Sequence, residues 1–97
     1  MPLSEDSQQT MLSIFKGRAN ARHKLDWSAF TKAMTELGFA IERQGVVYRF
    51  HAPKTYGGGV LTLHMEHDHT MQKSGQDRVM RRLSRAFHWD AKTFEAL

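Results

Sequence analysis

The segment from Asp26 to Trp89 limits the fold more than any other feature of this chain. Apolar residues recur at helical spacing at both of its ends, and they alternate with polar residues in three shorter runs between those ends. Three consecutive antiparallel strands with one apolar face need a cover, which the two flanking helices can supply. Together with one helix expected before Asp26, this order predicts an α+β fold of the type α-α-β-β-β-α, with a three-stranded antiparallel sheet packed by helices.

The helix expected over residues 26–37 carries the clearest signal. Asp26 stands at the N-cap position, and Gly38 can adopt the left-handed conformation that ends a helix. The apolar face of this helix consists of Trp27, Phe30, Met34 and Leu37. Because these four residues recur with the period of a helix, the pattern predicts that this face is buried against the sheet.

Three strands are expected over residues 39–43, 46–51 and 60–65. Gln44 and Gly45 are expected to form the hairpin turn between the first two strands, since glycine tolerates positive φ. The alternation of apolar and polar residues then sorts the side chains into two faces. Those expected to face the helices are Phe39, Ile41, Val46, Tyr48, Phe50, Leu61, Leu63 and Met65.

The last helix is expected to run from Ser74 or Gln76 to Phe87, with one apolar and one basic face. The apolar stripe consists of Val79, Leu83, Ala86 and Phe87. The opposite face carries Arg78, Arg81, Arg82 and Arg85, and Lys73 precedes them. Like charges four residues apart repel one another by a few tenths of a kcal/mol per pair, and a helix that needed only solubility would intersperse glutamates. This face therefore favours an anionic partner.

Composition narrows the class of protein. All 97 residues are expected to form one domain, with an N-terminal helix and a basic connector over residues 1–25 and the core over residues 26–89. The absence of cysteine excludes disulfides and cysteine-ligated zinc. No apolar run approaches the roughly 20 residues of a membrane span, and the polar start is unlike a secretory signal. We therefore expect an intracellular protein, cytoplasmic or nuclear, without membrane association.

Histidines gather at the end of the third strand and just after it, at His64, His67 and His69. Imidazoles can bind a metal, but on a strand His64 would point away from the other two, so the pattern favours exposed histidines, and no metal or cofactor is expected. His51, His64 and His67 are also candidates for general acid and base groups in RNA cleavage. Tyr56, beside three consecutive glycines, is a candidate for stacking on a base.

Four stretches of the chain together are similar to a known family. They are Trp27-x-x-Phe30-x-x-Ala33-Met34-x-x-Leu37-Gly38-Phe39, Gly45-x-x-Tyr48-x-Phe50, Leu61-Thr62-Leu63-His64-x-x-His67 and Arg81-Arg82-Leu83-x-Arg85-x-Phe87-x-Trp89. In this order and spacing they resemble a HicA-like domain, of the kind found at the C-terminal end of longer fungal proteins. HicA toxins of bacterial toxin–antitoxin pairs are messenger ribonucleases with a fold like that of double-stranded-RNA-binding domains. The resemblance implies that fold, and RNA as a partner.

The catalytic residues of the family are matched only in part. The toxins carry their essential histidine two residues after the hairpin glycine, and this position holds Val47, which cannot transfer a proton. His67 corresponds to the histidine that follows the third strand in the family. His51 shares the outward face of the second strand with Val47. The resemblance therefore implies either a loss of cleavage or its transfer to His67 and His51.

Three functional readings follow. The first is RNA binding through a basic helix face, with weak or absent cleavage; the residues expected to contact phosphates are Lys73, Arg78, Arg81, Arg82 and Arg85. The second is a metal-independent ribonuclease of the HicA type that uses His67 and His51. The third is a module for a protein partner or a homodimer, through an edge strand or the apolar side of the first helix. That side consists of Met11, Leu12, Ile14 and Phe15.

Overall fold

The computed structural model describes residues 3–16, 25–65, 70–71 and 73–95. In chain order the elements are α1 (Glu5–Lys16), β1 (Leu25–Asp26), α2 (Trp27–Glu36), β2 (Ala40–Gln44), β3 (Val47–His51), the 3-10 helix η1 (Lys54–Tyr56), β4 (Val60–His64), β5 (Thr70–Met71), α3 (Lys73–Phe87) and α4 (Ala91–Glu95). Strands β2, β3 and β4 form a three-stranded antiparallel sheet in that order. The predicted α+β fold is confirmed. Among the described residues, none of the helices has both the length and the apolar character needed to cross a membrane.

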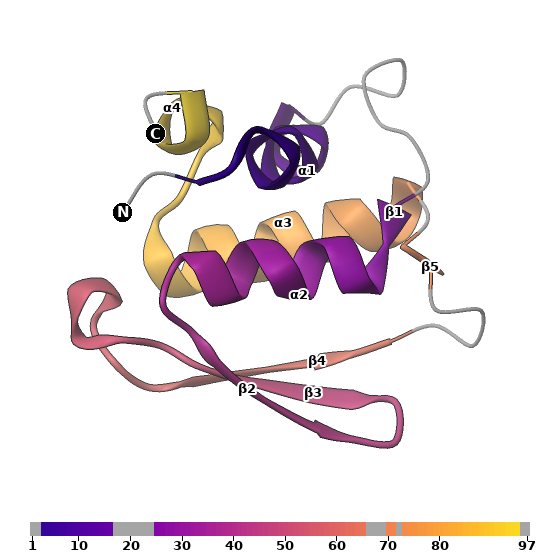
Figure 1. Ribbon diagram of the computed structural model, residues 1–97, viewed down its shortest axis with the longest axis vertical. Coiled ribbons are helices and arrows are strands. Elements are labelled where there is room, and N and C mark those ends of the chain that lie inside the picture. Colours follow the sequence, from indigo (N-terminus) through magenta and orange to yellow (C-terminus); the bar gives the residue numbers. More distant parts are fainter. Residues whose placement is uncertain (1–2, 17–24, 66–69, 72, 96–97) are drawn as a thin grey trace.

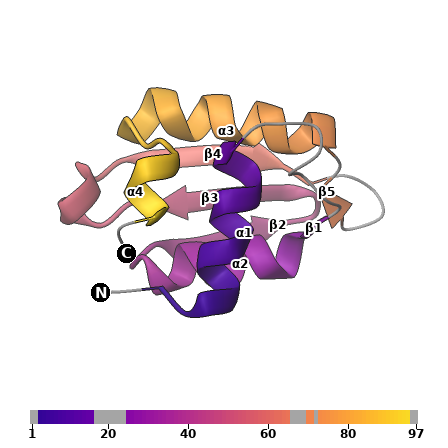
Figure 2. The same ribbon diagram turned by 90° about the horizontal axis from the view of Figure 1, so that it is seen from above.

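The elements are arranged in three layers (Figure 1). The sheet forms one outer layer, α2 and α3 lie across one of its faces, and α1 and α4 lie on the far side of these two helices (Figures 1 and 2). The opposite face of the sheet is covered by none of the described elements. The chain therefore has one buried sheet face, as predicted, and one open face.

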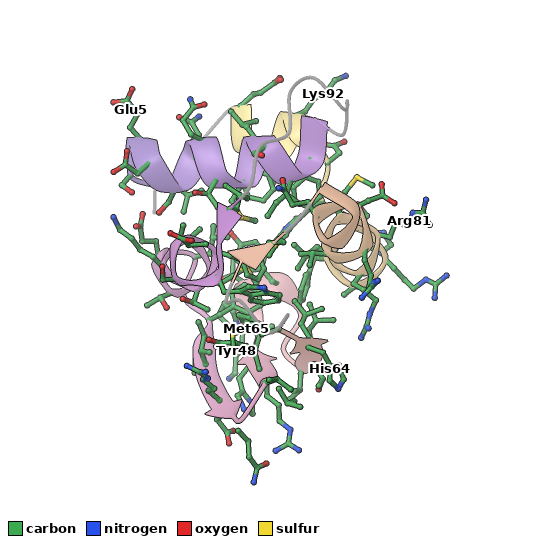
Figure 3. The ribbon with its side chains drawn as sticks, turned by 90° about the vertical axis from the view of Figure 1, so that its right-hand side faces the viewer. Glu5, Tyr48, His64, Met65, Arg81 and Lys92 are labelled. Carbon is green, nitrogen blue, oxygen red and sulfur yellow. The ribbon has the colours of Figure 1, made fainter. Side chains whose placement is uncertain are left out.

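The core lies between the sheet and the helices, and its centre is aromatic. The indole of Trp27 stacks on Tyr48 with ring centroids 5.4 Å apart, and Phe30 meets Phe50 edge-on at 5.5 Å. Tyr48 and Met65 point inward from the sheet, whereas His64 lies outside (Figure 3). Along β3 and β4 the alternation sorts side chains as expected, since Tyr48, Phe50, Leu61 and Leu63 are all buried.

The hairpin differs from the prediction by one residue. Gln44 pairs with Val47, so the two-residue turn consists of Gly45 and Val46 rather than Gln44 and Gly45. Gly45 has a φ of 63°, which favours glycine, and Val46 is 44% exposed instead of facing the helices. The shift changes every cross-strand pair between β2 and β3.

A second aromatic cluster closes the other end of the core. Tyr56 stacks on Phe39 at 5.8 Å and meets Trp89 edge-on at 5.1 Å, while Phe87 packs against Phe39 at 5.3 Å. The prediction that Tyr56 is free to stack on a base is therefore wrong, since its ring is engaged within the fold. The buried stripe of α3 also needs one correction, because Ala86 is exposed.

Helix α1 packs into the domain. Met11, Ile14 and Phe15 are buried, and Leu12 is half-buried against the same core. These side chains are not available as a surface for a protein partner. The prediction that the apolar side of the first helix forms an interface is therefore wrong. The burial arises because α1 crosses both α2 and α3 and covers apolar side chains that the sheet cannot reach (Figures 1 and 2).

Polar contacts hold α1 on the domain. Glu36, at the end of α2, accepts hydrogen bonds from the backbone N–H of Ser4 at 2.7 Å and from the hydroxyl groups of Ser4 and Ser7 at 3.1 and 2.7 Å. These bonds, first among them that from the Ser4 backbone, hold the pKa of Glu36 below its ordinary value. The hydroxyl of Ser13 donates to the fully buried side-chain amide of Gln76, which itself donates to the carbonyl of Met71. These hydrogen bonds join α1 and the residue before it to α2 and α3.

Two short strands add a feature that the sequence pattern does not predict. Leu25 and Asp26 pair antiparallel with Met71 and Thr70. Since β1 leads directly into α2 and β5 comes just before α3, this pairing brings the starts of the two sheet-covering helices together. Asp26 occupies the N-cap position of α2, as predicted, but its side chain makes no capping hydrogen bond.

Candidate nucleic-acid interface

The apolar and basic residues of α3 lie on opposite sides of the helix, as their spacing predicts. Val79 and Leu83 are buried against the core, and the four arginines are all exposed. Arg81 projects outward from α3 (Figure 3). We call the surface formed by Arg78, Arg81, Arg82 and Arg85 the arginine face. Because burial of the opposite side fixes the rotation of the helix, the arginine face is held toward solvent.

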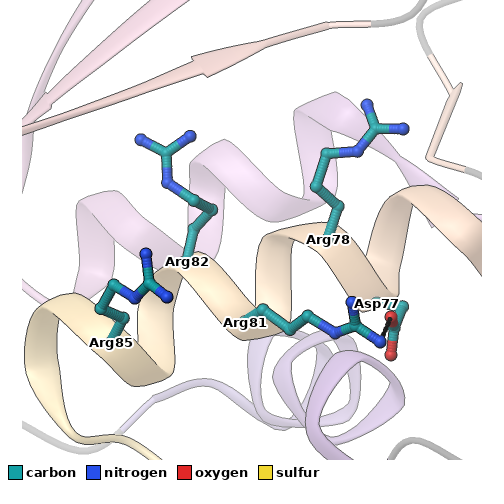
Figure 4. A pocket seen from close by; sticks show the side chains of 5 residues that line it. All are labelled: Asp77, Arg78, Arg81, Arg82 and Arg85. Atoms are coloured by element: carbon teal, nitrogen blue, oxygen red, sulfur yellow. Dashed lines mark ion pairs between the residues drawn. The ribbon is translucent and has the colours of Figure 1, made fainter.

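The arginine face borders an open hollow of about 460 Å³, whose lining also includes Asp77 (Figure 4). Asp77 pairs with Arg81 through a contact of 3.0 Å between Oδ2 and Nη2. The Arg81 side chain is 77% exposed, and exposed pairs of this kind contribute little to stability. The pair thus offsets one positive charge of the hollow and leaves a strongly basic surface.

Arg82 connects the arginine face to the sheet. Its Nη2 donates to the backbone carbonyl of Thr62 at 3.2 Å. Thr62 lies on β4, an edge strand of the sheet. In the part of the chain that the structure describes, Arg78 and Arg85 have no ion-pair partner. Two of the four guanidinium groups are therefore ready to bind an anion without first breaking an internal contact.

Of the predicted histidines that the structure describes, only His64 lies beside the arginine face, where it lines a crevice with Arg78 and Arg82. His51 lies on the open face of the sheet, where it is hydrogen-bonded to the carboxylate of Glu42. The register pairs His51 with Val60, and pairs Val47 with His64. The two histidines are therefore four residues apart along the strands, or about 13 Å, which is too far for both to act on one phosphodiester.

The open face of the sheet has its own basic hollow of about 300 Å³. Its lining consists of Glu42, Arg43, Gln44, Val47 and Arg49. Val47, the position at which the resemblance expects the catalytic histidine, lies here, and its side chain cannot transfer a proton. Glu42 is the residue that sequence reasoning missed as a partner of His51. The hairpin register would have identified it, but the turn was predicted one residue too early.

The structure does not describe the side chains of two predicted site residues, His67 and Lys73. His67 lies outside the described residues, as does His69. Lys73 is the first residue of α3, but its side chain lies outside the description. Among the residues that are described, no three histidine or acidic side chains are grouped to hold a metal ion.

No protein-family model, curated protein or solved structure matches this chain. The resemblance to HicA-like domains therefore rests on the residues quoted above and on the order of the elements.

Proposed function

We propose that this domain binds RNA by contacting phosphates with the arginine face. The observation that carries the proposal is the set of four exposed guanidinium groups around one hollow, with Asp77 as the acid that lines it. Guanidinium groups bind phosphate oxygens through paired, charge-assisted hydrogen bonds. The core does not need these side chains, since Val79 and Leu83 hold α3 in place. A function on the surface accounts for an arrangement that otherwise costs free energy through repulsion.

The geometry favours a short footprint. Arg78 and Arg85 are seven residues apart, or about 10 Å along the helix axis, so the arginine face spans only a few phosphates of a strand. Double-stranded-RNA-binding domains reach two successive minor grooves. The turn of Gly45 and Val46 is too short to enter a second groove. A single strand, or one groove of a duplex, is therefore the proposed ligand, with RNA preferred because of the resemblance to HicA-like domains.

A charge-reversal experiment tests this proposal. We expect the variant with Arg78→Glu, Arg82→Glu and Arg85→Glu to lose RNA binding in a fluorescence anisotropy titration, because the hollow then repels phosphates. The matched control carries Lys32→Glu, Lys54→Glu and Lys92→Glu, at three exposed positions outside the arginine face. Its net charge equals that of the arginine variant. Equal loss in both variants would mean that net charge alone governs binding, and unchanged binding in the first would refute the proposal.

A metal-independent ribonuclease is the second candidate, and the hydrogen bond between His51 and Glu42 favours it. A carboxylate that orients an imidazole is a common part of general acid–base sites. In cleavage of this type a base takes the proton of the 2′-hydroxyl, and its oxygen attacks the phosphorus. The bond to the 5′-oxygen breaks, an acid protonates that oxygen to a 5′-hydroxyl, and a 2′,3′-cyclic phosphate remains. The second proton-transferring group would be His67. The expected outcome is weak or absent cleavage, since Val47 stands where the family has its histidine.

The ribonuclease candidate has a direct test. Purified protein is incubated with RNA in the presence of a chelator, and the products are examined for cyclic phosphate ends. If cleavage occurs, His51→Ala, Glu42→Gln and His67→Ala should each lower its rate, the two histidine variants by roughly 10²–10⁴. Cleavage that survives His51→Ala and His67→Ala unchanged would exclude these residues as the acid and base.

A further inference from the structure

A narrow crevice of about 70 Å³ lies beside the arginine face, between α3, β4 and β5. Its inner wall is apolar and is formed by buried side chains, namely Leu63, Met71, Val79 and the indole of Trp27. Its exposed lining residues are Arg78, Arg82 and His64, and they place hydrogen-bond donors at the mouth. The crevice therefore combines an apolar floor with a cationic entrance.

Trp27, which lines the crevice, carries an unused hydrogen-bond donor. Trp27 is 3% exposed, and its Nε1 is the one buried side-chain polar atom in the described part of the chain without a hydrogen-bond partner. An indole N–H can only donate, so it needs an acceptor. Buried polar groups are almost always hydrogen-bonded, and an exception calls for an explanation such as a ligand.

We propose that the crevice binds the terminal phosphate of an RNA strand, with Arg78 and Arg82 on the phosphate oxygens and Trp27 Nε1 donating to one of them. This inference rests on the proposed function, because the adjoining strand would lie along the arginine face. The crevice has a volume of about 70 Å³, which gives room for a small group such as one phosphate. An internal phosphodiester continues on both sides, whereas a narrow crevice that is closed on its inner side admits only a group that ends the chain.

The four arginines differ in which of the two cavities they line. Arg78 and Arg82 line both the open hollow and the crevice, whereas Arg81 and Arg85 line the hollow without lining the crevice. Arg78 and Arg82 point to the same side of α3, while Arg81 turns along the helix toward Asp77 (Figure 4). The first pair is expected to recognise the strand end, and the second pair to attract any phosphate of the strand.

The test compares three oligoribonucleotides of one sequence, with a 5′-phosphate, with a 3′-phosphate and with hydroxyl groups at both ends. We expect one of the phosphorylated strands to bind about tenfold more tightly than the hydroxyl strand, the ratio that one charge-assisted hydrogen bond supplies. Arg78→Gln or Arg82→Gln should bring this ratio close to one. Arg81→Gln, the matched control, should weaken all three strands and leave the ratio unchanged.

The outcomes separate this inference from the proposed function. Equal affinity of the parent protein for all three strands would overturn the terminal-phosphate site and leave RNA binding intact, whereas no binding of any strand would overturn both. Nuclear magnetic resonance gives a second readout, since the chain has two indole N–H signals, from Trp27 and Trp89. The preferred phosphorylated strand should shift the Trp27 signal and the hydroxyl strand should not. A Trp27 signal that stays in place at saturation would also refute the inference.

Discussion

The salt dependence of RNA binding gives the sharpest quantitative check on the arginine face. Each phosphate contact of a basic side chain with single-stranded RNA lowers the logarithm of the affinity by about 0.7 per tenfold rise in salt. Four contacts from the arginine face predict a slope of about −2.8. Raising the salt from about 50 to about 200 mM should then lower the affinity roughly 50-fold.

The informative variant is Arg78→Gln with Arg85→Gln. These two side chains have no ion-pair partner among the described residues, so their replacement should leave the fold intact. With two contacts left, the slope should fall to about −1.4, and the same rise in salt should lower the affinity only about sevenfold. The assay is an anisotropy titration at four or more salt concentrations, for the parent and the variant.

A control variant removes the same charge from lysines outside α3. Lys54→Gln with Lys92→Gln does so at exposed sites and should leave the slope near −2.8. A slope that is unchanged in the arginine variant would show that Arg78 and Arg85 release no counterions on binding. The RNA would then lie elsewhere, and the hollow on the open sheet face, lined by Arg43 and Arg49, would become the site to examine.

Three further predictions concern the fold. Phe50→Ala should lower the free energy of unfolding in urea by about 3–5 kcal/mol, because the ring is fully buried and leaves a cavity; a loss below about 1 kcal/mol would contradict this packing. Gly45→Ala should cost roughly 1 kcal/mol and Gly45→Asn less, since φ is positive and the space is open, and a comparison of urea midpoints decides between them. The pKa of Glu36 lies below its ordinary value of 4.5, so its carboxylate stabilises the fold above that pH and loses this contribution as the pH falls through the folded pKa. Glu36→Gln should therefore flatten the acid side of the melting-temperature profile, and an identical profile would show that the serine contacts are not formed in solution.

The sequence by itself determined which segments form the main elements and which way most of their side chains face. The stripe of Trp27, Phe30 and Met34, the alternation along β3 and β4, and the arginine face all depend on the period of one helix or strand. Such periods involve only residues close together in the chain, and so they can be read without knowing the fold. This is why the exposure of Arg78, Arg81, Arg82 and Arg85 on one side of α3 could be predicted.

The tertiary structure alone decided how these elements meet. Both Gln44–Gly45 and Gly45–Val46 contain the glycine that a tight turn needs, so the local pattern does not decide between them, and the observed register has the second. That choice places Glu42 beside His51, a contact the predicted register would not allow. The pairing of β1 with β5, the burial of α1 and the crevice behind Arg78 join segments far apart in the chain. Their positions depend on register and on the fit of side chains between layers, which local periodicity does not encode.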